Sequence, residues 1–326
     1  RRLAILTGDS HRELTLSGDL NVTTHITLDQ GVATTSTPTF NRPAAPGGRC
    51  TLTSGTAVTT ADVTAATTLY YTPYEGAARP AEIALYDGSA TWTTYTLAEL
   101  SIAVPATTST MYDVFVYNNA GTRTLELTSW TNDTTRATAL VQQNEVLVRS
   151  GATTRLYVCS FRTTTVSGQT EDSVTRRFVW NYYNRVPRAM RVTEATDTWA
   201  YSTATIRQAN AATTNQLDFV VGVAEVALHA IVAASVQNST AGQTFAVGIG
   251  ADSTTAFATG FLAGNATSVV ANEDVLLRAE LIVYPAIGRH FYTWLERGTG
   301  SGTTTWNGDK AVPTIGQSGI HGTIEG

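Results

Sequence analysis

Short runs of alternating apolar and polar residues recur along the chain and predict a protein built of β-strands. Between Cys50 and Val192 these runs come in pairs around turn residues, as the two strands of a hairpin do. Residues 83–86 and 92–97, for example, flank Asp87-Gly88, a strong signal for a tight turn. Two further hairpins are predicted from residues 112–117 with 122–130, and 146–148 with 155–158.

The last third of the chain also contains short strand-like runs, but they are not arranged in pairs around single turns. Its short apolar or alternating runs are bounded by Gly, Asn, Asp or Pro, which favour turns between strands. Strands at this spacing over one stretch of chain are typical of a β-sandwich or jelly roll. The predicted strands are residues 217–223, 226–236, 245–250, 275–284 and 291–295.

The run from Val226 to Val236 differs from the others because both of its alternating faces are largely apolar. That pattern indicates a central strand covered on both faces, one of them by a neighbouring subunit. Its alanine content also permits a buried helix, and the sequence leaves this alternative open. A second helix is predicted at residues 134–143, where Asn132 or Asp133 supplies a cap and Ala137, Leu140 and Val141 follow helical spacing.

The first 47 residues form a region of a different kind. Residues 14–23 and 25–28 alternate apolar and hydroxyl positions around a turn, but the pieces are too small to bury a face alone. Neighbouring chains would have to supply the missing surface, which predicts oligomerisation. A linker follows at residues 41–48, rich in Pro and Gly. We therefore divide the chain into an attachment segment (1–47), a central β domain (48–192) and a C-terminal β-sandwich domain (193–326).

Composition supports a mainly β fold. Threonine, a β-branched residue, occurs 59 times, whereas Lys310 is the single lysine. An all-helical or doubly wound α/β enzyme is therefore excluded. The net charge of -5 lacks the basic footprint that nucleic acid requires. The most apolar stretch, residues 217–236, contains Asp218, Glu225 and His229, so we expect no membrane insertion.

No arrangement of residues specifies an active site. The histidines are scattered, and we expect neither a bound metal nor a cofactor. Glu171-Asp172 and Glu273-Asp274 are adjacent acids, which point to opposite faces of a strand and so form no catalytic pair. Cys50 and Cys159 are too few for a disulfide framework, and two buried thiols are favoured over one bridge. We expect a protein that is not an enzyme.

Two aromatic clusters are candidates for binding. Phe178, Trp180 and Tyr182 share one face of an extended segment and Tyr183 lies on the other. They suit a core or intersubunit strand, with a carbohydrate platform as the alternative. The second cluster precedes and follows a glycine-rich stretch, which would place its side chains on a flexible, exposed loop. Its candidate receptor or glycan contacts are Arg289, His290, Tyr292, Trp294 and Trp306.

Several segments resemble proteins of tailed-bacteriophage particles. Residues 28–40, with the preceding Leu-Ser-Gly-Asp-Leu-Asn-Val run, are similar to segments in the shafts and attachment regions of phage fibres. Residues 52–74, 83–88 and 177–186 and the tail from Gly300 to Gly322 resemble virion proteins of fibre or appendage type. The resemblance extends over nearly the whole chain and carries no catalytic residues.

What the resemblance implies is a virion structural protein on the particle exterior, commonly a homotrimer. Its N-terminal segment would bind other virion proteins, and its C-terminal part would contact a host surface glycan or protein. The sequence therefore predicts a trimeric tail fibre or spike that mediates host attachment. Two alternatives stay open: a capsid decoration or head-fibre protein, and, more weakly, a polysaccharide depolymerase. Such enzymes usually carry a long repeating β-helix, and the sequence contains no repeat of that kind.

Overall fold

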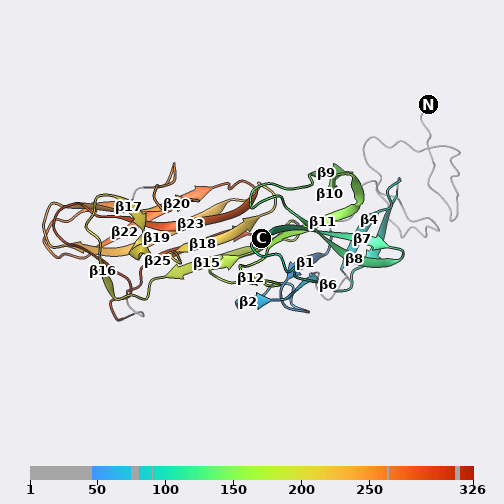
Figure 1. The fold of residues 1–326 in the computed structure, drawn as a ribbon, viewed down its shortest axis with the longest axis horizontal. Coiled ribbons are helices and arrows are strands. Elements are labelled where there is room, and N and C mark those ends of the chain that lie inside the picture. Colours follow the sequence, from blue (N-terminus) through green and yellow to red (C-terminus); the bar gives the residue numbers. More distant parts are fainter. Residues whose placement is uncertain (1–45, 75–80, 90, 263, 313–315) are drawn as a thin grey trace, which may run out of the picture. The chain divides into compact units, whose positions relative to one another are not determined.

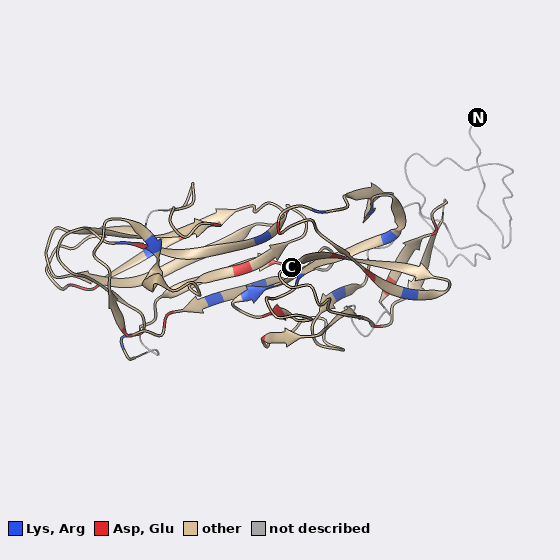
Figure 2. Ribbon diagram, in the orientation of Figure 1, with Lys and Arg blue, Asp and Glu red and all other residues tan. Residues whose placement is uncertain are grey.

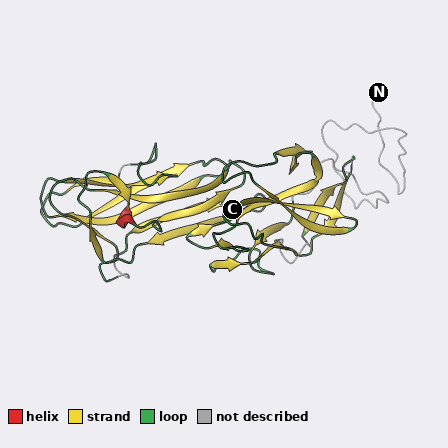
Figure 3. Cartoon of the chain, in the orientation of Figure 1, coloured by secondary structure: helices red, strands yellow, loops and turns green. Residues whose placement is uncertain are grey.

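The predicted mainly β fold is confirmed. The computed structural model describes residues 46–74, 81–89, 91–262, 264–312 and 316–326, in which the single helical element is a 3-10 turn, η1 (Ala209–Ala211) (Figure 3). The predicted attachment segment, residues 1–47, lies almost entirely outside the described residues. Threonine-rich alternation explains the result, since β-branched side chains suit a pleated, half-buried surface.

Two large sheets contain most of the C-terminal strands (Figure 1). The eight-stranded sheet has the order β2 (Val63–Ala66), β12 (Thr170–Asp172), β13 (Arg176–Arg177), β18 (Gln216–Val221), β23 (Gly288–Arg297), β20 (Thr244–Ala251) and β21 (Gly264–Thr267), with β17 (Ile206–Gln208) beside β23. The six-stranded sheet has the order β15 (Pro187–Thr193), β25 (Gly319–Glu325), β19 (Leu228–Asn238), β24 (Thr304–Asn307) and β16 (Thr198–Ala200), with β22 (Val275–Val283) on the other edge of β19.

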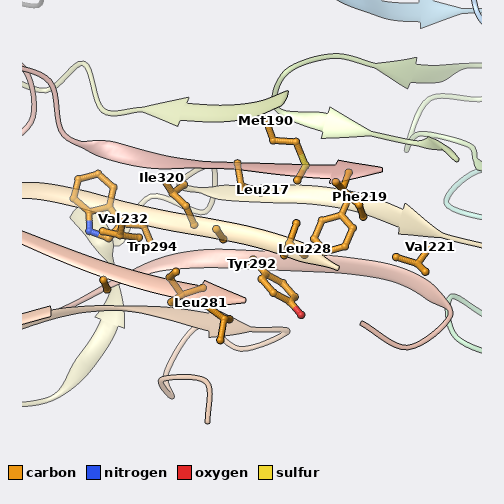
Figure 4. Close-up of a cluster of buried hydrophobic side chains, with 14 of the residues drawn as sticks. Met190, Leu217, Phe219, Val221, Leu228, Val232, Leu281, Tyr292, Trp294 and Ile320 are labelled. Carbon is orange, nitrogen blue, oxygen red and sulfur yellow. The ribbon is translucent and has the colours of Figure 1, made fainter. Parts of the chain in front are cut away.

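The two sheets enclose the larger hydrophobic core. Alternate residues of β19 and β22 are buried there, as are Phe219 of β18 and Tyr292 and Trp294 of β23 (Figure 4). Val232, Leu281 and Trp294 are at most 3% exposed. Period-2 alternation thus has the consequence expected of a sheet with one buried face.

The remaining strands form a hairpin-rich region. Another six-stranded sheet has the order β8 (Thr122–Ser129), β7 (Met111–Asn119), β11 (Ala152–Arg162), β10 (Val146–Arg149) and β9 (Leu140–Gln143), with β14 (Val179–Asn181) beside β11. The small sheets are β1 (Gly48–Thr51), β3 (Thr68–Pro73) and β6 (Leu100–Ala103), and the pair β4 (Glu82–Tyr86) and β5 (Trp92–Thr96). The three predicted hairpins are confirmed: β4 with β5, β7 with β8, and β10 with β11.

A disulfide joins the small sheet to the hairpin sheet, so the expectation of two free thiols is wrong. Cys50 in β1 and Cys159 in β11 are bonded, with their Cα atoms 6.5 Å apart. The second, smaller hydrophobic core surrounds this bridge. The two cysteines are separated by 109 positions, and only the packing of β1 against β11 brings them together.

The helix predicted over residues 134–143 is wrong. Residues 140–143 form β9, which pairs with β10, and the preceding residues form turns. Asn132 and Thr135 close a local β-bridge, while the Arg136 side chain extends to Asp113. The strand predicted at residues 226–236 is confirmed as β19, and its helical alternative is excluded.

The larger core contains side chains from both sides of residue 192, including Phe115 and Trp180 on one side and Phe219 and Trp294 on the other. The division of the chain at residues 47 and 192 stays a prediction.

Candidate functional site

The candidate receptor contacts at residues 289–306 lie in strands: the strand predicted at residues 291–295 is confirmed as part of β23, but its aromatic side chains are not on an exposed loop. Trp294 in β23 and Trp306 in β24 are 0% exposed, and Tyr292 and His290 are also buried. Alternating residues of β23 enter the larger core, and this places Tyr292 and Trp294 inside it. The Arg289 guanidinium is paired with Asp218, its Nη2 atom 2.6 Å from the carboxylate. The premise of an exposed aromatic loop is therefore wrong.

The aromatic cluster at residues 178–183 is divided between the core and its edge. Phe178 and Trp180 are buried in the larger core, whereas Tyr182 and Tyr183 are half-buried. The Tyr182 ring lies edge-on to Tyr183, with 4.7 Å between ring centroids. The chain does not extend in one strand here, because β14 ends at Asn181 and β15 begins at Pro187. A flat carbohydrate platform is thus not formed by these four side chains.

Exposed apolar side chains are concentrated instead in one stretch of the chain, in β22 and the segments on either side of it. Of ten exposed large apolar side chains among the described residues, six lie between residues 262 and 284. Exposed apolar side chains mark an interaction surface where they form a contiguous patch, so their positions in the sheet decide what they imply. The six are Leu262, Val269, Val270, Leu276, Ile282 and Tyr284.

Strand register places two of these residues on the face of the sheet that is turned away from the larger core, which we call the outer face. In β22, Leu277 and Leu281 are buried, while Leu276 and Ile282 are 76% and 64% exposed. The outer face also includes Ile231 and Ala233 of β19, which are half-buried. The cross-strand rows are Ile282, His229, Thr323 and Ala189; Glu280, Ile231, His321 and Arg191; and Arg278, Ala233, Gly319 and Thr193. Only one face of β19 is fully covered within the chain.

The outer face carries both basic and acidic groups. Its central acid, Glu280, accepts from His229 Nε2 at 2.7 Å and lies 3.1 Å from Arg278 Nη2. Partial burial, together with the neighbouring basic side chains of Arg278, His229 and Arg191, lowers the pKa of His321. The face is therefore mixed: on β22 the apolar Leu276 and Ile282 alternate with Arg278 and Glu280, and β25 and β15 add Glu325 and Arg191.

A polar cleft opens at the edge of the two large sheets, between the segment after β15 and the loop from η1 to β18. Its volume is about 580 Å³, within the range of roughly 300–1,000 Å³ that ligand pockets occupy. Hydroxyl and amide side chains dominate its lining: Thr175, Thr193, Thr196, Asn210, Thr213, Thr214, Asn215 and Gln216.

Glu194 organises one wall of the cleft. One carboxylate oxygen accepts from the Thr196 N–H at 2.9 Å, and the other accepts from the side-chain amides of Asn215 and Asn210 at 2.9 and 3.2 Å. Burial opposes ionisation, but the hydrogen bond from Asn215 and those from Thr196 and Asn210 outweigh it and lower the pKa of Glu194. The carboxylate thus fixes both asparagine side chains in the wall.

A second buried acid, Glu296 of β23, holds the same loop from behind. It is 0% exposed and accepts from Trp199 Nε1, from Arg207 Nε and from the backbone N–H of Asn210. Burial raises the pKa of Glu296 to about 7, although the bonds from Trp199 and Arg207 oppose the shift. Asn210 and Ala211 have φ values of 54° and 51°, a left-handed conformation that is unfavourable for alanine.

The acids of the cleft do not form a hydrolytic pair. A glycosidase needs one carboxyl group that donates a proton and a second that acts as base or nucleophile. Glu194 is held ionised, and both oxygens of Asp218 accept from Arg289 at 2.8 and 2.6 Å. Among the described residues, no three His, Cys, Asp or Glu side chains group as metal ligands. Nor does that part of the chain contain a helix able to span a membrane.

Sequence reasoning pointed to the β19 part of the outer face, as a face covered by a neighbouring subunit, but missed the β22 part and the cleft. The outer face had a readable signal, since Leu276 and Ile282 alternate against Leu277, Ala279 and Leu281 in β22. The cleft had none, because its walls come from segments that only the packing of β15 near β18 brings together.

No family model matches the chain, and no curated protein sequence matches it. Among solved structures, the chain is similar to the insecticidal delta-endotoxin Cry8Ea1 from Bacillus thuringiensis, with 9% identity and a TM-score of 0.26. The match covers 86% of this chain and 52% of that one, so the chain spans about half the length of the structure it matches. A TM-score of this size supports no argument about fold or function.

Proposed function

We propose that the chain is a structural protein of a tailed-bacteriophage particle, a homotrimeric tail fibre or spike that attaches the virion to its host. The observation that carries the proposal is the outer face of the six-stranded sheet. Leu276 and Ile282 are largely exposed there, on a strand whose other face is fully buried. A second copy of the chain would remove this apolar area from water, at roughly 25 cal/mol per Å². The resemblance to fibre and appendage proteins supplies the setting.

Charge on the outer face favours a ring of copies over a two-fold dimer. In a two-fold dimer the same patch meets itself, which would bring the Arg191 side chains of both copies, together with both Arg278–Glu280 pairs, into one interface. Like charges in an interface cost several kcal/mol. Packing the outer face against a different surface of the next copy avoids this, and such contacts close into rings such as trimers.

The scarcity of charge elsewhere agrees with an assembled structural protein. Lys, Arg, Asp and Glu are widely spaced along the strands (Figure 2). Threonine faces can be buried between copies at a smaller desolvation cost than charged faces. We propose binding and not catalysis, because the two acids of the polar cleft are engaged as acceptors.

Sedimentation equilibrium of the full chain at low micromolar concentration tests the proposal. We expect a species of three times the chain mass of 34.7 kDa. Replacing both Leu276 and Ile282 with serine should dissociate it, while Val166→Ser, an exposed valine outside the outer face, should leave it intact. A monomer at this concentration, or a trimer that the double substitution does not weaken, would contradict the proposal.

Labelling of intact particles tests where on the virion the protein is attached. Gold-labelled antibody against the chain should mark the tail. Label over the head lattice would instead support the alternative of a capsid decoration or head-fibre protein, and unlabelled particles would reject both.

A further inference from the structure

We propose that the polar cleft between the segment after β15 and the loop from η1 to β18 binds a neutral saccharide. The inference deepens the proposed attachment function and depends on it for its biological setting, but binding itself can be measured independently. The cleft of about 580 Å³ is lined mainly by hydroxyl and amide groups, and these match a ligand whose own hydroxyls both donate and accept.

The cleft is held in a fixed arrangement before any ligand enters. Glu194 orients the Asn210 and Asn215 amides, and Glu296 fixes the Asn210 backbone from the buried side. The backbone of Ala211 is in the left-handed region, which is unfavourable for alanine. Strained residues of this kind occur often at functional sites. A rigid polar wall reduces the entropy lost when a ligand binds.

The charges of the cleft favour a neutral ligand over an anionic one. Glu194 and Asp218 both lie in the lining. The partners of Glu194 are neutral amides and a backbone N–H, so this carboxylate keeps its charge and repels an added carboxylate. Asp218 is paired with Arg289 and attracts no second cation. Arg176 also lines the cleft, but its guanidinium is paired with Glu171 at 3.0 Å. Hydroxyls of a neutral sugar meet none of these penalties.

A peptide suits the cleft less well. Peptide recognition relies on apolar or aromatic anchors seated in pockets. The apolar residues in this lining are the small Val192, Ala195 and Ala212, and no aromatic side chain contributes to it. Three small apolar groups are enough to contact one face of a sugar ring but provide no anchor pocket.

Saturation-transfer NMR and calorimetric titration of the full-length protein test the inference. The probes are neutral oligosaccharides of glucose, mannose, galactose and N-acetylglucosamine, with oligoglucuronate as the anionic counterpart. We expect at least one neutral probe to bind and oligoglucuronate to bind at least about tenfold more weakly. Failure of every neutral probe, or equal binding of the anionic one, would overturn the proposal.

Two substitutions locate the binding. Thr213→Trp and Ala195→Trp place a bulky ring in the cleft from opposite walls, at positions exposed to solvent. Each should weaken binding by about tenfold or more, whereas Thr108→Trp, at an exposed loop position outside the cleft, should leave it unchanged. Unaltered binding in both cleft variants would reject the site. Sedimentation of the same samples distinguishes this result from a failure of the trimer proposal.

Discussion

The two hydrophobic cores of the molecule are held together differently. The larger core lies between two long sheets, and its side chains come from strands of up to eleven residues such as β19. The smaller core lies between the six-stranded hairpin sheet and the small sheets, and the Cys50–Cys159 disulfide crosses it. The contrast shows that two extended sheets can bury enough apolar surface by themselves, whereas a three-stranded sheet packed on a larger one gains from a covalent cross-link to it.

The cores are not independent, because one sheet contributes to both. In β7, Phe115 packs in the larger core, while its neighbours Val114 and Val116 pack in the smaller one. Between them Asp113 accepts from Arg136, which also donates to the Gly222 carbonyl oxygen at 2.6 Å. The chain should therefore unfold in one transition, and the following predictions test that expectation, beginning with the largest effect.

Truncating Trp294 should destabilise the molecule most. Trp294 is 0% exposed and packs edge-on to Trp199, with centroids 5.8 Å apart. Trp294→Ala should lower the free energy of unfolding by about 3–5 kcal/mol, measured by urea denaturation. The indole N–H of Trp294 is buried and has no hydrogen-bond partner among the described residues. Trp294→Phe, which removes that N–H but keeps an aromatic ring, should cost less. An equal loss for both variants would contradict the packing argument.

Removing the disulfide should have the second-largest effect on the free energy of unfolding. Replacing both Cys50 and Cys159 with alanine should cost about 2–5 kcal/mol, because the bridge constrains a long loop in the unfolded chain. Reduction of the native protein should give the same shift of the urea midpoint, and reductant should not affect the alanine variant. Loss of the disulfide could instead shift only part of the urea transition to lower concentration and leave the tryptophan fluorescence change of the larger core at its original midpoint. The two cores would then unfold as separate units.

Glu296 makes the larger core sensitive to pH. Its pKa is about 7 in the folded protein and near 4.5 when unfolded, so the folded state binds more protons between these values. The stability contributed by Glu296 is therefore present below pH 4.5 and is lost as pH rises to about 7. Glu296→Gln lacks this titration. The stability difference between wild type and this variant should fall by about 2–3 kcal/mol from pH 4.5 to pH 8. A constant difference would mean that Glu296 does not titrate in this range.

Sequence alone predicted the strands well because alternation reports local burial. It identified the hairpin of β7 and β8 and the central strand β19. It failed where distant residues decide the outcome. Cys50 and Cys159 are brought together by tertiary packing. Residues 134–143 have helical spacing, but Arg136 in this segment pairs with Asp113 and the segment forms turns and a strand. A glycine-rich stretch follows Tyr292 and Trp294, so the sequence suggested that they are exposed near a loop. They lie in β23, and their side chains are buried in the larger core.

The smallest effect on stability should come from a residue that belongs to neither core. Leu276 is 76% exposed, although Leu277 beside it is buried. Leu276→Thr keeps a residue suited to a strand and should change the unfolding free energy of the dissociated chain by less than about 0.5 kcal/mol. Leu277→Thr should cost several times more, since it places a hydroxyl in the larger core. If both substitutions were equally destabilising, Leu276 would be a packing residue of the chain. If only Leu277→Thr is destabilising, the apolar side chain of Leu276 is not needed for folding. This result would agree with the proposed role of Leu276 in contacts between copies of the chain.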